Sequence, residues 1–305
     1  MIAISPKGDL RNAAWIDLLS PTEDELAQVR AATGLRVPTQ EQVSEIESTS
    51  RLAFEKGAWY LSTPLVSPRP EGDYGLAAAG FVLAPKHLIT IRFEPIAAID
   101  AALKSCGADT AEHAFLHILE VVIDRAADAL ERAGAACDVI SHEAFRKSER
   151  EKKRAADLRE TLRRVGMEAD KTSHIRDALL GLGRMASYVG DSGLVGAPQV
   201  SSQRLKAIRA DINSLTDYES HLSSKIQFLL DATLGYINVE QNDVVKTLTI
   251  ASVVGIPPVI IAGVYGMNFH DIPEYGWKHG YPYSLALMAV TAFLTWLWFK
   301  RRGWT

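Results

Sequence analysis

Two apolar runs without charged side chains lie close together near the C-terminal end of this 305-residue sequence. The first, Thr247–Tyr265, has no ionisable side chain except its final tyrosine, and the second, Tyr281–Phe299, has none except two tyrosines. A helix needs about 20 apolar residues to cross a bilayer, so each run is long enough. Because only the short polar segment Asn268–Gly280 separates them, the sequence predicts a transmembrane hairpin and therefore an integral membrane protein.

The charges around the two runs predict their orientation. The connecting segment carries Lys278 with two acidic residues, whereas Lys246 and Lys300-Arg301-Arg302 flank the opposite ends. Lys and Arg are enriched on the cytoplasmic side of a membrane. Met1–Leu10 also lacks the apolar core of a signal peptide. We therefore expect a two-pass protein of the cell (inner) membrane, with both termini cytoplasmic and the connecting loop outside.

The first part of the chain, residues 1–106, predicts a mixed α/β cytosolic domain. Ser20 is expected to cap a helix that begins at Pro21, and Pro38–Ser50 predicts another short helix. Pro64–Gly75 has three prolines and two glycines and predicts a loop. Short runs rich in β-branched and aromatic residues predict strands at Trp15–Leu18, Ala58–Thr63, Gly80–Leu83 and Leu88–Phe93.

Residues 107–198 predict a pair of cytosolic helices. Apolar residues recur at helical spacing after Ala111, and helical character continues to Tyr188 with a break. The charged segment Arg146–Arg154 is interpreted as solvated helix rather than as a nucleic-acid site. The Gly- and Pro-containing segment Gly190–Pro198 then turns the chain.

Residues 199–265 predict one very long helix, because no proline occurs from about Val200 until Pro257. Such a helix would be roughly 90 Å long, enough to cross a membrane and extend far beyond it. One apolar stripe should pack against other helices: Leu205, Ile208, Ile212, Leu215, Leu222, Ile226 and Leu229. A second stripe is polar: Asp217, His221, Ser224, Asp231, Asn238 and Asn242. A solvated surface would explain the polar stripe, but its place beside a membrane span favours the wall of a water-filled funnel.

The residues after the long helix carry a family resemblance. Tyr265-Gly266-Met267-Asn268-Phe269, followed by Ile272-Pro273-Glu274, Gly280-Tyr281-Pro282 and the basic end, resembles the CorA family of divalent-cation channels. The resemblance extends back to Leu229-Leu230-Asp231, Asn242 and Lys246-Thr247-Leu248-Thr249. It implies a homopentamer in the bilayer that moves Mg²⁺, and also Co²⁺ or Ni²⁺. The remaining segments are then an outer loop at 266–280, a second transmembrane helix at 281–299 and a basic cytosolic tail at 300–305.

In the related channels, copies of the long helix surround the pore. The resemblance therefore implies that the polar stripe continues upward as the pore lining: Asp231, Asn238, Asn242, Val245, Leu248, Ser252 and Ile256. Neutral amide oxygens at Asn242 can receive a hydrated cation, and aliphatic rings above it can gate by excluding water. Plain contact with lipid or another helix is the alternative for Val245, Leu248 and Ile256.

Gly266, Met267 and Asn268 are the predicted selectivity filter at the outer mouth. Mg²⁺ loses its water slowly and prefers oxygen ligands, so Asn268 would bind the ion through its hydrating waters. Met267 is expected to pack behind the mouth. An ordinary helix C-cap is the alternative, since Gly and Asn are favoured there.

Further candidate metal sites follow from the resemblance and from the loop. Asp271 and Glu274 resemble the acidic outer loop of the family and would raise the local cation concentration. Asp211 and Asp217 are candidates for a cytosolic regulatory Mg²⁺ site, although a solvated surface explains each equally well. His270 and His279 raise the alternative of a ZntB-like Zn²⁺ transporter, but their spacing matches no compact zinc motif.

Composition excludes several other classes. The net charge of −4 and the lack of a long basic tract argue against nucleic acid as a partner. Cys106 and Cys137 have no metal-ligand spacing and are expected to be buried thiols. Neither catalytic residues nor an organic cofactor are expected, so the protein is interpreted as a non-enzyme. A non-conducting, membrane-anchored coiled-coil scaffold or sensor remains the alternative of another class.

Overall fold

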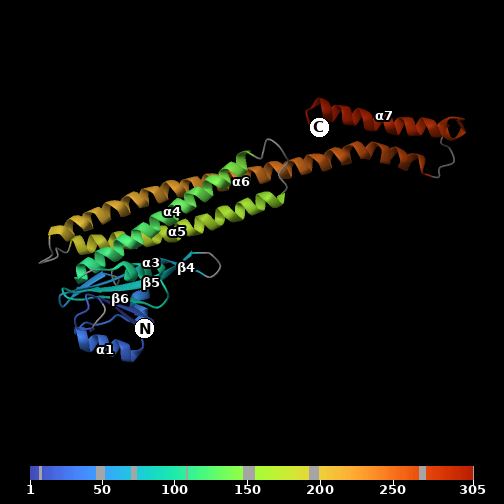
Figure 1. Ribbon diagram of the computed structural model, residues 1–305. Helices are drawn as coiled ribbons and strands as arrows, with labels where there is room; N and C mark the ends of the chain where they lie inside the picture. Colours follow the sequence, from blue (N-terminus) through green and yellow to red (C-terminus); the bar gives the residue numbers. More distant parts are fainter. Residues whose placement is uncertain are drawn as a thin grey trace. The chain divides into compact units, whose positions relative to one another are not determined.

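The computed structural model describes residues 1–6, 9–45, 52–69, 74–107, 109–146, 155–191, 199–267 and 273–304 (Figure 1). The chain divides into two compact units. The first comprises Met1–Lys152 with Arg159–Asp231, and the second comprises Lys153–Leu158 with Ala232–Thr305.

The first unit contains a six-stranded sheet in the order β1-β2-β6-β5-β4-β3. Only β2 and β6 are parallel, and the other neighbouring pairs are antiparallel. The sequence predicted the central strands but missed the short edge strands β1 and β3. The strands are β1 (Ile2–Ser5), β2 (Trp15–Leu19), β3 (Leu52–Glu55), β4 (Ala58–Pro68), β5 (Tyr74–Leu83) and β6 (Leu88–Arg92).

Both faces of the sheet are covered because the central strands are apolar on both sides. On one face, Ile16, Val82 and Ile89 form a core with Val29 of α1 (Glu23–Thr33) and Val43 of α2 (Gln40–Ser44). On the other face, alternate residues of the same strands meet α3 (Ala97–Ser105) and the long helices. The expected α/β domain is therefore confirmed.

The helix after β2 begins later than the sequence predicted. Thr22, not Ser20, caps α1: its Oγ1 accepts a hydrogen bond from the Glu25 amide at 3.3 Å, and Glu25 Oε2 accepts one from the Thr22 amide at 2.9 Å. Ser20 instead adopts a left-handed φ of 43° and donates its hydroxyl to the carbonyl of Phe93. Ser20 is thus held by the end of β6, which local sequence does not reveal.

The predicted loop at Pro64–Gly75 was wrong over much of its length. β4 continues to Pro68 and β5 begins at Tyr74, so most of this segment is a hairpin, and Pro64 pairs in register with Ala78. Proline is tolerated in a sheet where its strand lacks a partner on one side. The described pairing of β3 with β4 covers Ala58 to Leu61 of β4, so no described residue of β3 pairs with Pro64.

A buried charged cluster fastens the helical face of the sheet. Arg92 of β6 donates to Asp17 of β2 at 2.9 Å and to Asp100 of α3 at 2.6 Å, and Thr90 donates to Asp17 at 2.6 Å. Burial opposes the positive charge of Arg92, but the hydrogen bonds to Asp17 and Asp100 outweigh it and raise the pKa of the guanidinium. The cluster is internally satisfied and ties β2, β6 and α3 together.

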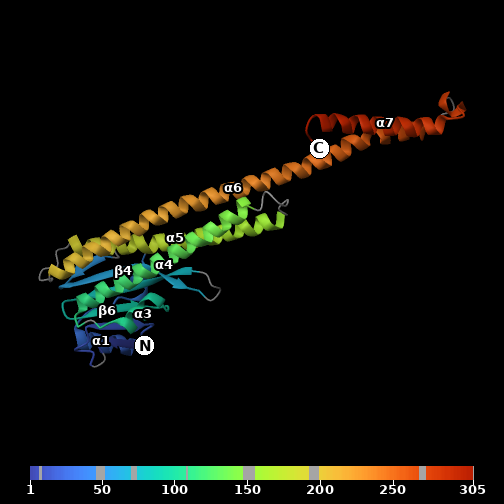
Figure 2. The ribbon, with the colours of Figure 1, turned by 45° about the horizontal axis from the view of Figure 1, so that its top comes forward.

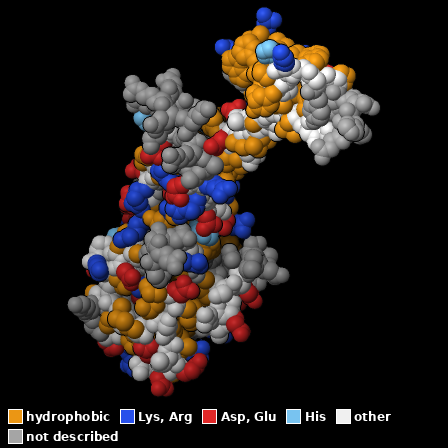
Figure 3. Space-filling view, turned by 90° about the vertical axis from the view of Figure 1, so that its right-hand side faces the viewer, with side chains coloured by type: hydrophobic (Ala, Val, Ile, Leu, Met, Phe, Trp, Pro, Cys, Tyr) orange, Lys and Arg blue, Asp and Glu red, His pale blue; other side chains and the backbone are white. Residues whose placement is uncertain are grey.

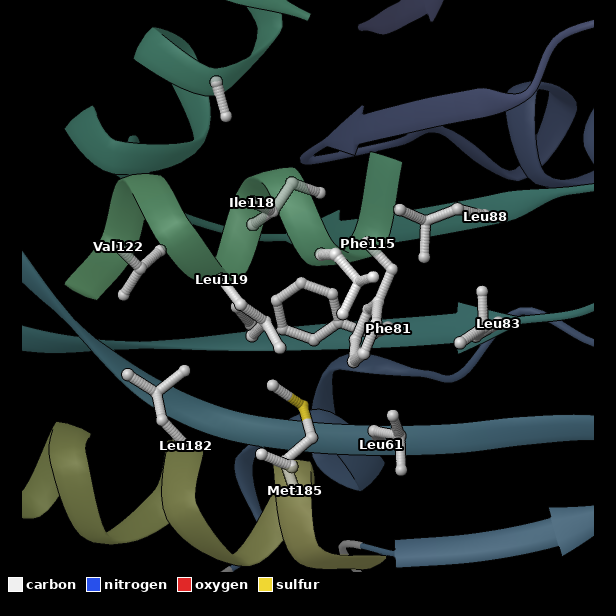
Figure 4. Close-up of a cluster of buried hydrophobic side chains, with 14 of the residues drawn as sticks. Leu61, Phe81, Leu83, Leu88, Phe115, Ile118, Leu119, Val122, Leu182 and Met185 are labelled. Atoms are coloured by element: carbon white, nitrogen blue, oxygen red, sulfur yellow. The ribbon is translucent and has the colours of Figure 1, made fainter. Parts of the chain in front are cut away.

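Long helices complete the first unit, as predicted. Helices α4 (Ala111–Arg146), α5 (Ala155–Asp191) and the first half of α6 (Gln199–Tyr265) lie side by side in both ribbon views (Figures 1 and 2). Figure 4 shows Phe81 of β5 and Phe115 of α4 at the centre of their shared core, with Met185 of α5 beside them. The two rings make an edge contact with centroids 6.1 Å apart. The predicted break between α4 and α5 falls at 147–154, outside the described residues.

The apolar stripe of α6 packs against α4 and α5 as its spacing predicted. All of its members are buried except Leu215, which is partly buried against the same cores. Cross-helix ion pairs reinforce this contact: Arg204–Glu120 at 2.7 Å, Glu219–Arg176 at 2.7 Å and Lys225–Asp138 at 2.6 Å.

The second unit consists of the end of α6, a short 3₁₀ turn at Pro273–Gly276 and helix α7 (Gly280–Arg301). Among the described residues, two helices are long and apolar enough to cross a membrane, at Ser202–Tyr265 and Gly280–Arg301. Helix α7 runs back beside the end of α6 in both ribbon views (Figure 2). Hydrophobic side chains dominate the described surface of this hairpin (Figure 3). The expected pair of apolar helices is confirmed, and α6 continues unbroken through Pro257 and Pro258.

Candidate functional site

The predicted pore lining lies on a part of α6 whose side chains the described residues leave largely exposed. The most apolar window of this helix is 0% buried within the chain. Val245, Leu248 and Ile256 are 58%, 63% and 52% exposed, and Asn238, Asn242 and Ser252 are also exposed. At about 100° per residue, positions 238 to 256 of the predicted lining fall on one arc of the helix about 120° wide. This arc is free to face lipid or further copies of the chain.

The arc combines uncharged polar and aliphatic groups. The Asn238 and Asn242 amides come first along α6, and the aliphatic side chains follow toward its end at Tyr265. The neighbouring charges of α6 are paired with each other, since Lys246 Nζ lies 3.4 Å from Asp243 Oδ1. An arc of this kind offers a cation neutral oxygens at one level and a dry constriction at the next.

Asp231, at the inner end of the predicted lining, is exposed and has a partner on its own helix. Its Oδ1 accepts a hydrogen bond from Gln227 Nε2 at 3.1 Å. One carboxylate oxygen is therefore engaged along the helix, and the other is free to meet a hydrated cation.

The end of α6 leads directly into Gly266 and Met267, the first two residues of the predicted filter. The Gly266 amide donates to the Ala262 carbonyl at 2.8 Å, and the Met267 amide donates to that of Val264 at 3.3 Å. Gly266 is not left-handed, so it does not form the usual glycine C-cap. A Cβ at Gly266 would lie 3.0 Å from the Ala262 carbonyl oxygen. Glycine is therefore favoured here because a side chain would crowd the backbone of the preceding turn.

Met267 is 47% exposed, and the structure gives no support for its packing behind the mouth. Asn268, the key residue of the predicted filter, lies outside the described residues, as do Asp271 and His270 of the loop. The filter therefore stays a prediction.

The described part of the outer loop is a compact turn leading into α7. Glu274 lies in the 3₁₀ turn, and its carbonyl accepts a hydrogen bond from the Trp277 amide at 3.1 Å. The Trp277 and Tyr283 rings are in edge contact with centroids 5.7 Å apart. A Cβ at Gly280 would come within 2.5 Å of the Glu274 carbonyl oxygen. Gly280 thus permits the close approach that holds the Glu274 turn against the start of α7, which the sequence did not reveal.

The candidate regulatory aspartates do not form a site within one chain. Asp211 and Asp217 are both exposed on α6, but six residues of helix place them about 120° apart around its axis. Among the residues that the structure describes, no group of three or more His, Cys, Asp or Glu side chains could hold a metal ion. That finding also leaves His279 without a zinc-binding cluster in the described part of the loop.

Sequence reasoning also missed a buried charged residue, Glu219, in the first half of α6. Glu219 lies in the apolar stripe between Leu215 and Leu222 and is 1% exposed. Its Oε2 accepts from Arg176, and its Oε1 accepts from Ser223 at 2.6 Å. A glutamate at the three-to-four spacing of the apolar stripe is the signal that could have predicted a buried ion pair.

An α/β body joined by one very long helix to an apolar hairpin, with an uncharged arc exposed on that long helix, defines a two-span membrane protein. Comparison with known proteins narrows this further. The chain belongs to the CorA-like Mg²⁺ transporter protein family, whose model matches residues 11–301. It is an integral membrane protein, in agreement with the two apolar helices.

Individual relatives cover nearly the whole chain. The chain is 29% identical over 304 residues to a magnesium transport protein CorA of Pasteurella multocida, covering 97% of this chain and 93% of the relative. Among solved structures, the complete CorA magnesium transporter from Methanocaldococcus jannaschii matches with a TM-score of 0.76 at 19% identity, over 95% of this chain and 91% of the other. The full-length CmaX protein matches with a TM-score of 0.68 at 17% identity, over 94% and 87%. At these identities the structures support the fold.

Proposed function

We propose that this chain assembles into a homopentameric channel that moves Mg²⁺ across the cell membrane, with Co²⁺ and Ni²⁺ as further ions it accepts. Family membership supports Mg²⁺ as the transported ion. The single structural observation that carries the proposal is the exposed arc of α6, because it combines amides and aliphatic side chains on a membrane helix whose most apolar window is not buried by the described residues. Copies of the chain arranged around an axis would bury this arc and leave the apolar remainder for lipid.

Within such a pore, the arc divides the work between two levels. A ring of Asn242 amides presents neutral oxygens to a hydrated cation. These oxygens lower the free-energy cost of entering the pore without binding the ion so tightly that it cannot leave. The rings of Val245, Leu248 and Ile256 above it are wide enough for water only when the helices separate, so they gate by dewetting. Asp231 and Asn238 continue the path into the inner funnel.

At the outer end, we assign ion selection to Gly266, Met267 and Asn268. The Asn268 amide oxygens contact the waters of hydrated Mg²⁺, which dehydrates reluctantly. Glu274, held in its turn by the contact with Gly280, supplies negative potential that raises the local cation concentration, together with Asp271. Both termini lie in the cytoplasm in this arrangement, since the basic residues flank the inner ends of the spans.

A regulatory Mg²⁺ site between subunits is the finer part of the proposal. Because Asp211 and Asp217 point about 120° apart, a shared ion would join Asp211 of one copy to Asp217 of the next rather than both from one chain. Raising Mg²⁺ should then slow proteolysis of the cytosolic domain, and Asp211→Ala with Asp217→Ala should abolish the protection. Unchanged protection in the double variant would remove both residues from the site.

Flux into proteoliposomes tests the function itself. Purified protein is reconstituted around a Mg²⁺-sensitive dye, and uptake of Mg²⁺, Co²⁺, Ni²⁺ and Zn²⁺ is compared with that of empty liposomes. Uptake of Mg²⁺ with little Zn²⁺ is the expected result. Preferential Zn²⁺ uptake would establish the zinc transporter, and no flux of any of these ions from a correctly assembled oligomer would establish a scaffold or sensor.

A further inference from the structure

The C-terminal end of α7 carries basic side chains seated on tryptophan rings. Lys300 Nζ lies 5.0 Å from the centroid of the Trp296 ring, and Arg302 Cζ lies 4.7 Å from that of the Trp298 ring. Both pairs are spaced by four residues, so each cation stands one helical turn beyond its ring. Cation–π contacts of this kind fix the direction of an otherwise flexible side chain.

The chain after Arg302 turns back onto the last turn of α7. Gly303 adopts a left-handed φ of 73°, and the Trp304 amide donates to the Phe299 carbonyl at 3.1 Å. The turn brings the Trp304 ring to 5.5 Å from the ring of Phe299, which is itself 5.1 Å from Trp298. Phe299 is buried, whereas Trp298 and Trp304 are half exposed at 51% and 45%. We call the rings of Trp298, Phe299 and Trp304 the aromatic platform, and Lys300 and Arg302 lie at its edge.

The positive charge at this end has no internal counter-charge in the part of the chain that the structure describes. Lys300, Arg301 and Arg302 are all exposed and make no ion pair with a described carboxylate. The sequence contains no Asp or Glu after Glu274. On the adjacent part of α6, Asp243 is already paired with Lys246 at 3.4 Å. Since no described carboxylate neutralises the platform, a partner that binds it is expected to bring its own negative charge.

We infer that the end of α7 is a binding site for the phosphate headgroup of an anionic phospholipid of the phosphatidylglycerol type. Tryptophan is enriched at the level of the headgroups, where its ring lies among acyl chains and its edge meets water. Lys300 and Arg302 would then point their donors at the lipid phosphate, with the exposed indole rings against the glycerol and upper acyl chain. The inference requires that α7 spans a bilayer, not that the chain conducts ions.

The same geometry disfavours a zwitterionic lipid. The headgroup of phosphatidylcholine carries a quaternary ammonium that needs a carboxylate or a free aromatic face. Lys300 and Arg302 each cover one face of the Trp296 and Trp298 rings and would repel an ammonium group, and the sequence after Glu274 contains no Asp or Glu to pair with it. The site should therefore discriminate by net headgroup charge.

Arg301 provides a matched control for the proposal. It has the same charge and exposure as Arg302, but no contact with a tryptophan ring is seen for it. Each basic residue near a headgroup contributes roughly fivefold to anionic-lipid affinity. Lys300→Gln and Arg302→Gln should each weaken binding about fivefold, whereas Arg301→Gln should weaken it less than twofold.

Native mass spectrometry of the detergent-purified full-length chain tests this directly, with phosphatidylglycerol, phosphatidylcholine and soluble glycerol 3-phosphate as separate probes. Retention of phosphatidylglycerol adducts that Arg302→Gln loses and Arg301→Gln keeps is the expected result. Equal loss in Arg301→Gln would show general surface charge, equal retention of phosphatidylcholine would show an apolar belt, and competition by glycerol 3-phosphate at the same concentration would show a free-phosphate site. Each of these outcomes overturns the inference.

A second measurement guards against misfolded variants because it uses the wild-type chain. In nanodiscs, lipid with brominated acyl chains quenches the fluorescence of nearby tryptophans. Brominated phosphatidylglycerol diluted in phosphatidylcholine should quench more than brominated phosphatidylcholine at the same fraction, because the site enriches it beside Trp298. Equal quenching by both lipids would contradict the inference.

Discussion

Arg176 of α5 donates a hydrogen bond from Nε to Oε2 of Glu219 on α6 over 2.7 Å. The Glu219 side chain is 1% exposed, whereas that of Arg176 is 44% exposed. The pair therefore fastens a buried carboxylate of the long helix to the neighbouring helix α5. Removing Arg176 should cost free energy of folding mainly because Glu219 would then be a buried charge without its charged partner.

Removing Arg176 should destabilise the first unit. Arg176→Ala leaves the buried Glu219 carboxylate with the Ser223 hydroxyl as its hydrogen-bond donor, and the cost should be about 2 kcal/mol, or roughly 4–8 °C in melting temperature. Adding Glu219→Gln should recover most of that loss because the buried charge is gone. Thermal melting of the purified full-length protein measures both changes.

The control for this pair is Arg163→Ala. Arg163 forms an ion pair with Glu160 at 2.7 Å, but both side chains are more than half exposed, at 62% and 54%. Exposed pairs of this kind contribute little, so the melting temperature should change by less than about 2 °C. A drop in Arg176→Ala no larger than that of the control would show that the buried pair does not fasten α6 to α5.

The thiol of Cys137 should make the first unit sensitive to alkali. Burial, with a smaller effect of the nearby Glu168 charge, raises the pKa of Cys137 from its ordinary 9.0 to about 11. A raised folded-state pKa stabilises the protein fully below pH 9 and loses that stabilisation as the pH rises from 9 to 11. The loss should be on the order of 2 kcal/mol, and Cys137→Ala should lack it.

Melting curves of the wild type and Cys137→Ala between pH 8 and pH 11 measure this difference. Because other groups also titrate in this range, Cys106→Ala serves as the control, and it should follow the wild type. A constant difference between wild type and Cys137→Ala across the range would contradict the assignment.

The sequence predicted those features that local spacing alone determines. Uncharged runs predicted both apolar helices, since one Asp or Lys in the centre of such a helix is costly in lipid. The three-to-four spacing from Leu205 to Leu229 predicted the face of α6 that packs on α4 and α5. In each case the physical cause lies within a few turns of one helix.

Features that depend on distant partners were not predicted. Pro64 lies in a strand because β4 pairs with β5, where Ala78 is its register partner, and the ion-pair partner of Glu219 lies 43 residues upstream. Gly280 looks like an ordinary turn residue until the Glu274 carbonyl is seen beside it. For the filter, Asn268 and its neighbours in the loop were identified by family resemblance, and their placement lies outside the described residues.

Gly280→Ala should weaken ion capture. The added methyl group would come within 2.5 Å of the Glu274 carbonyl and displace the acidic turn from the start of α7. The apparent affinity for Mg²⁺ in a flux assay should fall by about fivefold or more, with the maximal rate less affected. Gly276→Ala is the control, since a Cβ there meets nothing within 4 Å. Equal effects of the two variants would rule out a specific role for the Gly280 contact.

Asn242→Leu should suppress flux while leaving assembly intact. The substitution removes the amide ring that receives the hydrated ion and extends the dry section by one level. Thr247→Val is a matched polar-to-apolar control, because five residues of helix place it about 140° away from Asn242. Uptake into proteoliposomes and the size of the detergent-solubilised oligomer measure the two properties. Wild-type flux in Asn242→Leu would mean that the pore does not follow this arc.

The central claim is that the ion enters with its water shell, through neutral oxygens at Asn268. Asn268→Ala should abolish Mg²⁺ uptake although both spans and the oligomer persist, and Asn268→Asp should bind cations more tightly and conduct poorly, because added charge deepens the well the ion must leave. The most direct measurement is block of Mg²⁺ uptake by cobalt hexaammine, which mimics the hydrated ion and cannot exchange its ligands. We expect cobalt hexaammine to block Mg²⁺ uptake by the wild type. Undiminished Mg²⁺ uptake in the presence of cobalt hexaammine, or normal uptake by Asn268→Ala, would contradict it.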